Sequence, residues 1–244
     1  MTTDRKFDPA ALLARIAEAS EQLCDTAAKF DDAAVREPSL LPGWSRGRVL
    51  THLARNADGG TNLLVWARTG VETPAYPSTA ARAEQIEAGA GRSAAALLDD
   101  VRGSAARFAA ECARMPATAW GRTVRWTGGE ESPAAGVADS RRVEVLLHHV
   151  DLAAGYTSAQ WPEDFVDDTL GRVVASFGRR TDGPAMRLHA SDRGGAWYET
   201  ASTARRIPTI EGSRAALLAW LTGRSGGADL VTTGTALPAL PALC

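Results

Sequence analysis

Histidine and glutamate side chains spaced four residues apart give the chain its clearest chemical signal. The sequence has four histidines, and His148 follows Glu144 at position i+4 within the mostly apolar segment 143–150. On a helix this spacing places both side chains on one face, where they can hold one cation. A carboxylate on an apolar face is costly unless it is paired or bound to a metal.

A second histidine has similar surroundings. His52 lies among apolar residues in segment 50–53. Two histidines and one glutamate from facing helices would form a three-ligand site, which suits zinc with an open fourth position, as in catalytic zinc sites. A salt bridge or a hydrogen-bonded pair explains the Glu144–His148 spacing without a metal, and the spacing alone leaves both interpretations open.

Three other residues need a separate assignment. His149 points about 100° away from His148 around a helix, so we expect it at the surface or in packing. His189 falls on a predicted strand, and we expect it to be exposed. Asp151 lies three residues beyond His148; it is either an acceptor that orients that histidine or a solvated charge at a helix end.

The cysteines indicate a reducing compartment. Cys24, Cys112 and Cys244 are odd in number and widely spaced, so they predict no disulfide framework. Cys24 and Cys112 fall on apolar helical faces, which predicts small core residues. No cysteine neighbours a candidate base in sequence, so any thiol chemistry would use a thiol from outside the chain.

Helices must position the candidate ligands. We expect Ser45 to cap the helix that carries His52, and Ser132-Pro133 to begin the helix that carries Glu144 and His148. Four helices of this length predict a four-helix bundle. The expected elements are a helix over 9–30, one from 45 to about 64, a loop over 70–79, a helix around 97–112, a small hairpin over 121–131 and a helix from 132 to about 154.

The sequence pattern changes after a linker at residues 156–162. We expect a helix over 165–177, a strand over 186–190 paired with 196–201, a short helix over 213–221 and a last strand over 229–233. The predicted fold class is therefore α+β, with a helical bundle over residues 1–157 and a smaller α/β domain over 158–244.

Composition excludes several classes of protein. The 244 residues carry a formal net charge of −2, without the basic excess typical of nucleic-acid-binding proteins. No stretch approaches 18 uncharged apolar residues, and the N-terminus lacks the apolar core of a signal peptide. We therefore expect a cytoplasmic protein with no membrane or nucleic-acid partner. Abundant alanine, with lysine only at Lys6 and Lys29, is typical of a high-GC bacterium.

Several segments together resemble one family. Residues 41–46 and 50–57 resemble the start of the second helix in mycothiol-dependent maleylpyruvate isomerases. The resemblance continues in residues 71–76 with Arg82 and Ile86, in residues 141–144 with His148 and residues 150–152, and in residues 223–225. It runs from about residue 8 to residue 235 and has anchors in both predicted domains.

This resemblance implies a DinB-like four-helix bundle followed by an α/β domain, with zinc held by His52, Glu144 and His148. The implied cofactor is mycothiol, a thiol of actinobacteria, and the implied reaction converts maleylpyruvate to fumarylpyruvate in the gentisate pathway of aromatic degradation. A metal-activated thiolate would add reversibly to the double bond, which could then rotate. Arg224 matches the motif whose arginine is catalytic in the family, and an arginine suits the transient enolate.

Other interpretations remain open for the reaction, for the class of protein and for the role of Arg224. A mycothiol S-transferase would use the same metal and thiol but release a conjugate. A non-catalytic zinc regulator would use cysteine ligands, which the chain does not offer. Arg224 could simply cap the preceding helix. The chain also departs from some family members by having Arg55 where they have an aromatic residue.

Overall fold

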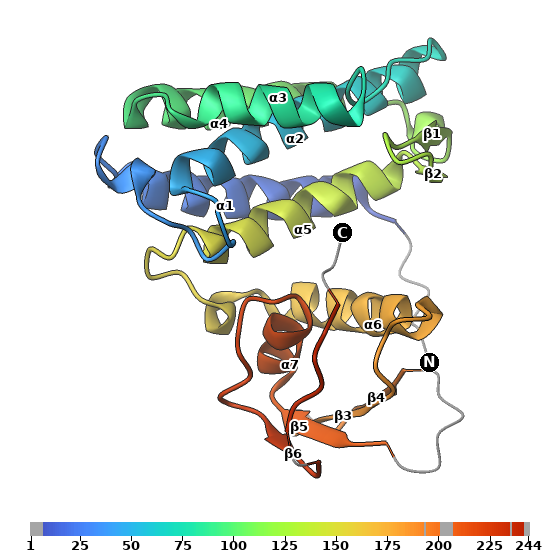
Figure 1. Cartoon of the computed structure of the whole chain (residues 1–244). Coiled ribbons are helices and arrows are strands. Elements are labelled where there is room, and N and C mark those ends of the chain that lie inside the picture. The colour runs from blue at the N-terminus through green and yellow to red at the C-terminus, as the bar shows by residue number, and fades with distance from the viewer. Residues whose placement is uncertain (1–6, 193, 201–206, 235, 242–244) are drawn as a thin grey trace. The chain divides into compact units, whose positions relative to one another are not determined.

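Two compact units make up the chain, Met1–Ala154 and Gly155–Cys244, and each is described by itself. The computed structural model describes residues 7–192, 194–200, 207–234 and 236–241. Helices dominate the first unit, whereas the second combines helices with a small sheet (Figure 1). This is the α+β class that the sequence predicts. In the described ranges, no helix is both long and apolar enough to cross a membrane.

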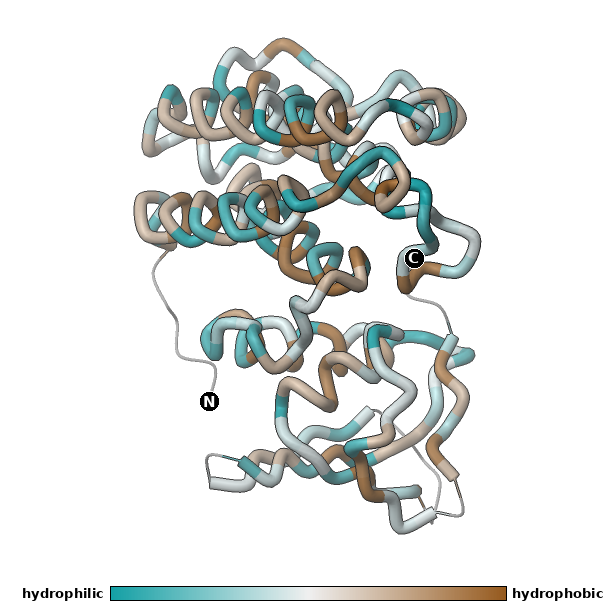
Figure 2. The backbone as a smooth tube through the Cα atoms, turned by 90° about the vertical axis from the view of Figure 1, so that its left-hand side faces the viewer, coloured by the Kyte–Doolittle hydropathy of each residue, from teal (hydrophilic) through white to brown (hydrophobic). Residues whose placement is uncertain are grey.

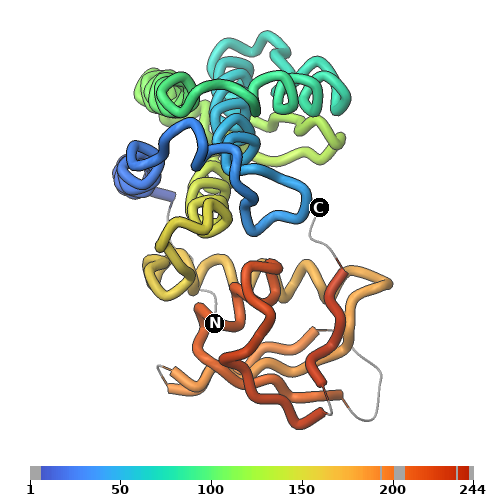
Figure 3. The backbone as a smooth tube through the Cα atoms, turned by 60° about the vertical axis from the view of Figure 1, so that its left-hand side comes forward, coloured from blue at the N-terminus to red at the C-terminus, as the bar shows by residue number. Residues whose placement is uncertain are grey.

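Four helices of the first unit form a closed bundle. Helix α2 packs against α4 and α5, and α1 packs against the same two helices from the other side. Figure 3 shows α2 in light blue beside α5 in yellow. The helices are α1 (Pro9–Ala27), α2 (Arg46–Thr69), α4 (Ala94–Ala113) and α5 (Ala135–Asp151); short 3-10 turns cover η1 (Ala34–Arg36) and η2 (Ala117–Ala119).

Polar caps set the first residues of the helices. The side chain of Ser45 accepts a hydrogen bond from the Arg48 N–H, which confirms the predicted start of α2. Ser93 caps α4 in the same way. Helix α2 ends at Thr69 and is capped by Gly70, whose φ of 78° is the left-handed conformation favoured by glycine.

The hydrophobic core of the bundle follows the apolar stripes of these helices. Hydrophobic and hydrophilic residues alternate along each helix (Figure 2). Leu53, Leu64 and Phe108 are buried, and so are Cys24 and Cys112. Their burial confirms the prediction that both cysteines are core residues, and both are free thiols. Cys244 lies outside the described residues.

A further helix, α3 (Thr79–Ala90), packs against α2 and was absent from the sequence prediction. The two helices approach closely at glycines. A Cβ atom added at Gly47 would lie 2.5 Å from the carbonyl oxygen of Ala90, and one added at Gly89 would lie 2.5 Å from Thr51 Cγ2. The missing side chains therefore let α3 rest directly on α2.

The predicted start of α5 at Ser132-Pro133 is wrong. Glu131–Pro133 forms strand β2, which pairs antiparallel with β1 (Thr123–Arg125), and the helix begins only at Ala135. Cross-strand pairing and the hydrogen bond from Trp126 Nε1 to Ser132 Oγ, at 2.9 Å, hold these residues in the hairpin. The predicted hairpin itself is confirmed.

The second unit contains a mixed sheet in the order β4-β3-β5-β6. Strands β3 and β5 are parallel, and the outer strands pair antiparallel with them. Its elements are η3 (Ser158–Gln160), α6 (Glu163–Arg179), β3 (Arg187–Ala190), β4 (Trp197–Glu199), β5 (Thr209–Gly212), α7 (Arg214–Leu221) and β6 (Val231–Thr232). The predicted helices, and strands at three of these positions, are confirmed. The sequence prediction omitted β5, and Ala201 at the end of the expected partner strand lies outside the described residues.

Candidate metal centre

Three side chains from two helices converge in the first unit. His52 projects from α2, while Glu144 and His148 project from α5. His52 Nε2 lies 2.8 Å from Glu144 Oε2 and 3.0 Å from His148 Nε2, and His148 Nε2 lies 3.3 Å from Glu144 Oε2. Zinc bonds of about 2.0–2.1 Å at tetrahedral angles would separate two ligand atoms by about 3.3 Å. The three potential ligand atoms thus need only small shifts to surround one ion.

Burial differs among these three residues, which we call the histidine–glutamate cluster. The side chain of His52 is 5% exposed, whereas those of His148 and Glu144 are 14% and 28% exposed. The cluster therefore has a closed side at His52 and a more accessible side at Glu144. An open fourth position, as a catalytic zinc site requires, is compatible with this accessibility.

Asp151 fixes the orientation of His148. Its Oδ2 lies 2.7 Å from His148 Nδ1, and its side chain is only 1% exposed. The carboxylate accepts the Nδ1 proton, so the lone pair of Nε2 is directed at the cluster. Of the two interpretations of Asp151, the orienting acceptor fits the structure and the solvated charge is wrong.

Arg82, from α3, contacts the other ring nitrogen of His52. Its Nη2 lies 3.1 Å from His52 Nδ1. A guanidinium group has only donors, so Nδ1 must accept, and neutral His52 then carries its proton on Nε2 and donates it to Glu144. A metal ion at Nε2 needs the lone pair there, with the proton on Nδ1. Glu144 therefore fits a metal as it stands, His148 fits one in its neutral form, and His52 fits one once Arg82 withdraws.

Electrostatics favours a charged glutamate beside a neutral histidine. Burial opposes the charge of Glu144, but its hydrogen bonds with His148 and His52 outweigh burial and hold its pKa well below the usual value. Burial lowers the pKa of His52. Burial also opposes the charge of His148, but its bonds to Asp151 and Glu144 outweigh this effect and raise its pKa. The cluster thus offers an anionic oxygen to a cation.

The remaining histidines lie outside the cluster. His149 is buried, and its Nε2 lies 2.8 Å from Thr26 Oγ1 of α1, so it is a packing residue. His189 stacks on Trp197 with ring centroids 4.3 Å apart, and its Nδ1 lies 3.1 Å from Glu211. Its side chain is only 24% exposed, so the prediction that it is exposed is wrong: pairing and stacking on the sheet cover it.

Arg224 belongs to the second unit, whereas the cluster lies entirely in the first. Its backbone N–H donates to the Ala219 carbonyl at 2.7 Å, and its Nη1 donates to the Thr222 carbonyl at 2.6 Å. Both acceptors lie at the C-terminal end of α7, where helix carbonyls lack intrahelical partners. These contacts are those of a helix cap, and the catalytic role of Arg224 stays a prediction.

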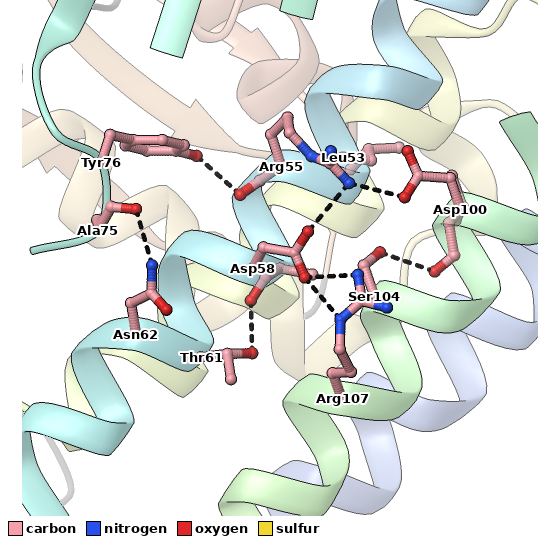
Figure 4. Close-up of polar contacts among 12 residues, drawn as sticks. Leu53, Arg55, Asp58, Thr61, Asn62, Ala75, Tyr76, Asp100, Ser104 and Arg107 are labelled. Atoms are coloured by element: carbon pink, nitrogen blue, oxygen red, sulfur yellow. Dashed lines mark hydrogen bonds and ion pairs between the residues drawn. The ribbon is translucent and has the colours of Figure 1, made fainter. Parts of the chain in front are cut away.

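Arg55 takes part in ion pairs between α2 and α4 (Figure 4). Its Nη2 lies 2.7 Å from Asp100 and 3.0 Å from Asp58, and Asp58 also binds Arg107. The hydroxyl of Tyr76 donates to the Arg55 carbonyl at 3.0 Å. Arg55 is therefore a cation held by two carboxylates.

Arg82 is a candidate functional residue that the sequence indicates only through its place in a family motif. Its position depends on α3, which has a single buried side chain, Ile86, and so gives no apolar stripe. Its contact with His52 joins residues 30 positions apart on separate helices, and no spacing rule predicts such a contact. The motif containing Arg82 was the one available signal.

A four-helix bundle with a two-histidine, one-carboxylate cluster, in a chain that also forms a small α/β unit, defines a two-domain protein with a candidate metal centre. Family models described as the mycothiol maleylpyruvate isomerase N-terminal domain and the MDMPI C-terminal domain match residues 4–153 and 160–242. The chain belongs to this family of isomerase enzymes.

Solved structures agree with this assignment. One is described as the mycothiol-dependent maleylpyruvate isomerase; it is 28% identical, with a TM-score of 0.92 and 100% of both chains covered. Another is described as the H52A mutant of the mycothiol-dependent maleylpyruvate isomerase, with 27% identity, a TM-score of 0.92 and the same coverage. No curated protein matches the chain.

Proposed function

We propose that this enzyme is a zinc- and mycothiol-dependent cis–trans isomerase that converts maleylpyruvate to fumarylpyruvate. The observation that carries the proposal is the convergence of His52, Glu144 and His148, whose potential ligand atoms all lie within 4.8 Å of one another. Membership of the family and the likeness to a solved isomerase supply the reaction class. The gentisate pathway of aromatic degradation is part of this proposal and is supported by the family resemblance. The free thiols of Cys24 and Cys112 agree with a cytoplasmic enzyme.

Zinc would be held by the three residues of the histidine–glutamate cluster. Bound there, it would lower the pKa of a thiol in its open position, so that mycothiol supplies a thiolate for reversible addition to the double bond. Glu144 contributes the negative charge that partly balances the ion. Asp151 keeps His148 in the tautomer that presents Nε2, and its burial prevents water from replacing it.

Arginines would bind the negative charges of the substrate. Arg82 loses its acceptor on His52 when His52 binds a metal, and its guanidinium is then free beside the cluster to bind a substrate carboxylate. Arg224 is the second candidate, as the donor that stabilises the enolate oxygen during rotation. Its support is the Gly223-Arg224-Ser225 motif of the family resemblance.

A direct assay tests the proposal. The chain would be stripped of metal and then supplied with zinc and mycothiol, separately and together, while conversion of maleylpyruvate is followed spectrophotometrically. We expect turnover only with both present, and full turnover in an Ala110→Phe variant on the exposed side of α4. Absence of turnover with both present would overturn the proposed function, and accumulation of a mycothiol conjugate would identify an S-transferase instead.

A further inference from the structure

A cavity of about 390 Å³ lies between α1 and α4, with one residue of α5 in its lining. Its walls are mostly apolar, and exposed alanines such as Ala17 and Ala106 lie among the lining residues. His52, Glu144, His148 and Arg82 do not line it, so it is separate from the candidate metal centre. The size and the apolar walls are those of a small-molecule pocket.

Two polar atoms in this lining lack partners. Arg141 of α5 is 3% exposed, and its Nη1 donates to the Leu53 carbonyl at 2.8 Å and to Asn56 Oδ1 at 2.9 Å. Its Nε is buried and has no hydrogen-bond partner among the described residues, and neither has the hydroxyl of Ser20. A buried donor without a partner is costly, so such groups in native proteins normally have an acceptor.

The guanidinium of Arg141 is also short of a bonded counter-ion. Burial lowers its pKa to about 10, so it stays charged at neutral pH while shielded from water. Glu144 acts on it electrostatically, but the carboxylate of Glu144 is hydrogen-bonded to the two histidines of the cluster.

The other charges of the lining lie in solvent. Arg102, Glu21 and Asp25 are exposed, and water and salt screen exposed charges. One cation and two carboxylates at the exposed edge therefore have less effect on a bound molecule than the one buried cation. The buried end of the cavity selects for an anion, and its walls select for an apolar body.

We propose that this cavity binds a small organic acid. Its apolar body packs between α1 and α4, and its carboxylate forms an ion pair with the guanidinium of Arg141, which belongs to the lining, with Ser20 as a second polar partner. A water molecule could satisfy the donors, but it would leave the buried charge without an anion and the apolar walls unfilled. The proposal is independent of the metal and of the isomerase reaction.

Binding of a matched pair of probes tests the proposal. 4-Fluorobenzoate and its neutral analogue 4-fluorobenzamide would be titrated into the full chain and followed by ¹⁹F NMR. We expect saturable binding of the benzoate and binding of the amide weaker by about tenfold or more, as for loss of a charge-assisted hydrogen bond. Equal affinity for the two probes, or no binding of the benzoate, would overturn the proposal.

Variants distinguish binding in this cavity from binding at other sites. Ala106→Phe fills the cavity from an exposed position and should abolish binding, whereas Ala110→Phe, exposed on the same helix but outside the lining, should not. Arg141→Gln should weaken the benzoate and leave the amide unchanged; if that variant does not fold, the Ala106 and Ala110 pair still decides. His52→Ala should leave binding unchanged, and loss of binding there would move the site to the histidine–glutamate cluster and refute the proposal.

Discussion

Arg82 and Glu144 contact the two different nitrogens of the His52 ring. Arg82 Nη2 lies 3.1 Å from Nδ1, and Glu144 Oε2 lies 2.8 Å from Nε2. Because arginine can only donate, the ring must present its lone pair to Arg82 and its proton to Glu144. A metal ion at Nε2 reverses both roles, so metal binding and the Arg82 contact exclude each other.

Arg82→Met should therefore strengthen zinc binding. We expect a dissociation constant about threefold to tenfold lower, since one competing hydrogen bond and one nearby positive charge are removed. Competition with a chromophoric chelator measures the change. Arg107→Met, which removes a charge on α4 that is paired with Asp58 of α2, is the control and should leave zinc affinity unaltered. Weaker zinc binding by Arg82→Met would show that the arginine supports the metal site.

Removal of a ligand should deplete the metal. His52→Ala, Glu144→Ala and His148→Ala should each lower zinc affinity by about 100-fold or more, because loss of one of three ligands is more severe than loss of an orienting partner. Metal analysis after dialysis measures occupancy. His149→Ala should keep its zinc, since its Nε2 contacts Thr26 instead. Full zinc content in Glu144→Ala would contradict the proposed ligand set.

Asp151→Ala should weaken zinc binding without removing a ligand. We expect a loss of about 10-fold to 100-fold, because His148 would lose the acceptor that holds its tautomer and ring orientation. Calorimetric titration of the metal-free protein gives the affinity. Asp99→Ala, at an exposed position on α4, is the matched control. Equal affinities in the two variants would mean that Asp151 serves packing alone.

Arg224→Lys distinguishes a catalytic donor from a helix cap. If Arg224 stabilises the enolate, turnover should fall by about 100-fold or more, with zinc content and melting temperature unchanged. A cap contributes only about 0.3–1 kcal/mol to stability. Steady-state kinetics and thermal unfolding measure both effects. Unchanged turnover would contradict the catalytic role and support a structural one, to which its contacts with Ala219 and Thr222 contribute.

Cys24 and Cys112 should react only slowly with alkylating reagents. Burial and the neighbouring Glu111 charge raise the pKa of Cys112 to about 12, and burial also raises the pKa of Cys24. At pH 8 about one Cys112 thiol in 10⁴ would be ionised. In a Cys244→Ser variant, iodoacetamide should therefore label the folded protein far more slowly than the unfolded protein, as followed by mass spectrometry. Rapid labelling of the folded protein would show that one of these thiols is accessible and activated.

Periodic apolar residues made most of the bundle predictable. Leu53 and Leu64 lie on one stripe of α2, and Phe108 lies on the stripe of α4, so sequence spacing alone indicated these helices. Glu144 and His148 were predictable as a pair because both lie on one helix, four residues apart. Their meeting with His52 depends on how α2 packs against α5, and the family resemblance supplied that contact.

Features without a periodic pattern could not be predicted. Helix α3 is short and rich in alanine, and Ile86 is its single buried residue. Its sequence therefore has no apolar stripe that would predict a helix. The dipeptide Ser132-Pro133 has the residue types of a helix start, but pairing with β1 overrides that local preference. Strand β5 has only four residues, and its parallel pairing with β3 leaves no turn signal between them.

Because α2 and α3 are in close contact at two glycines, substitutions outside the histidine–glutamate cluster can change its affinity for a metal. Gly47 and Gly89 do not touch the cluster, yet they set how deeply the helix that carries Arg82 sits. A methyl group at either position would act as a wedge, lifting α3 and drawing the guanidinium back from His52. Relatives with larger residues at these two positions should bind the metal without competition from the arginine. In such relatives the arginine would lie too far from the substrate to bind its carboxylate, so tighter binding of the metal would accompany weaker binding of the acid.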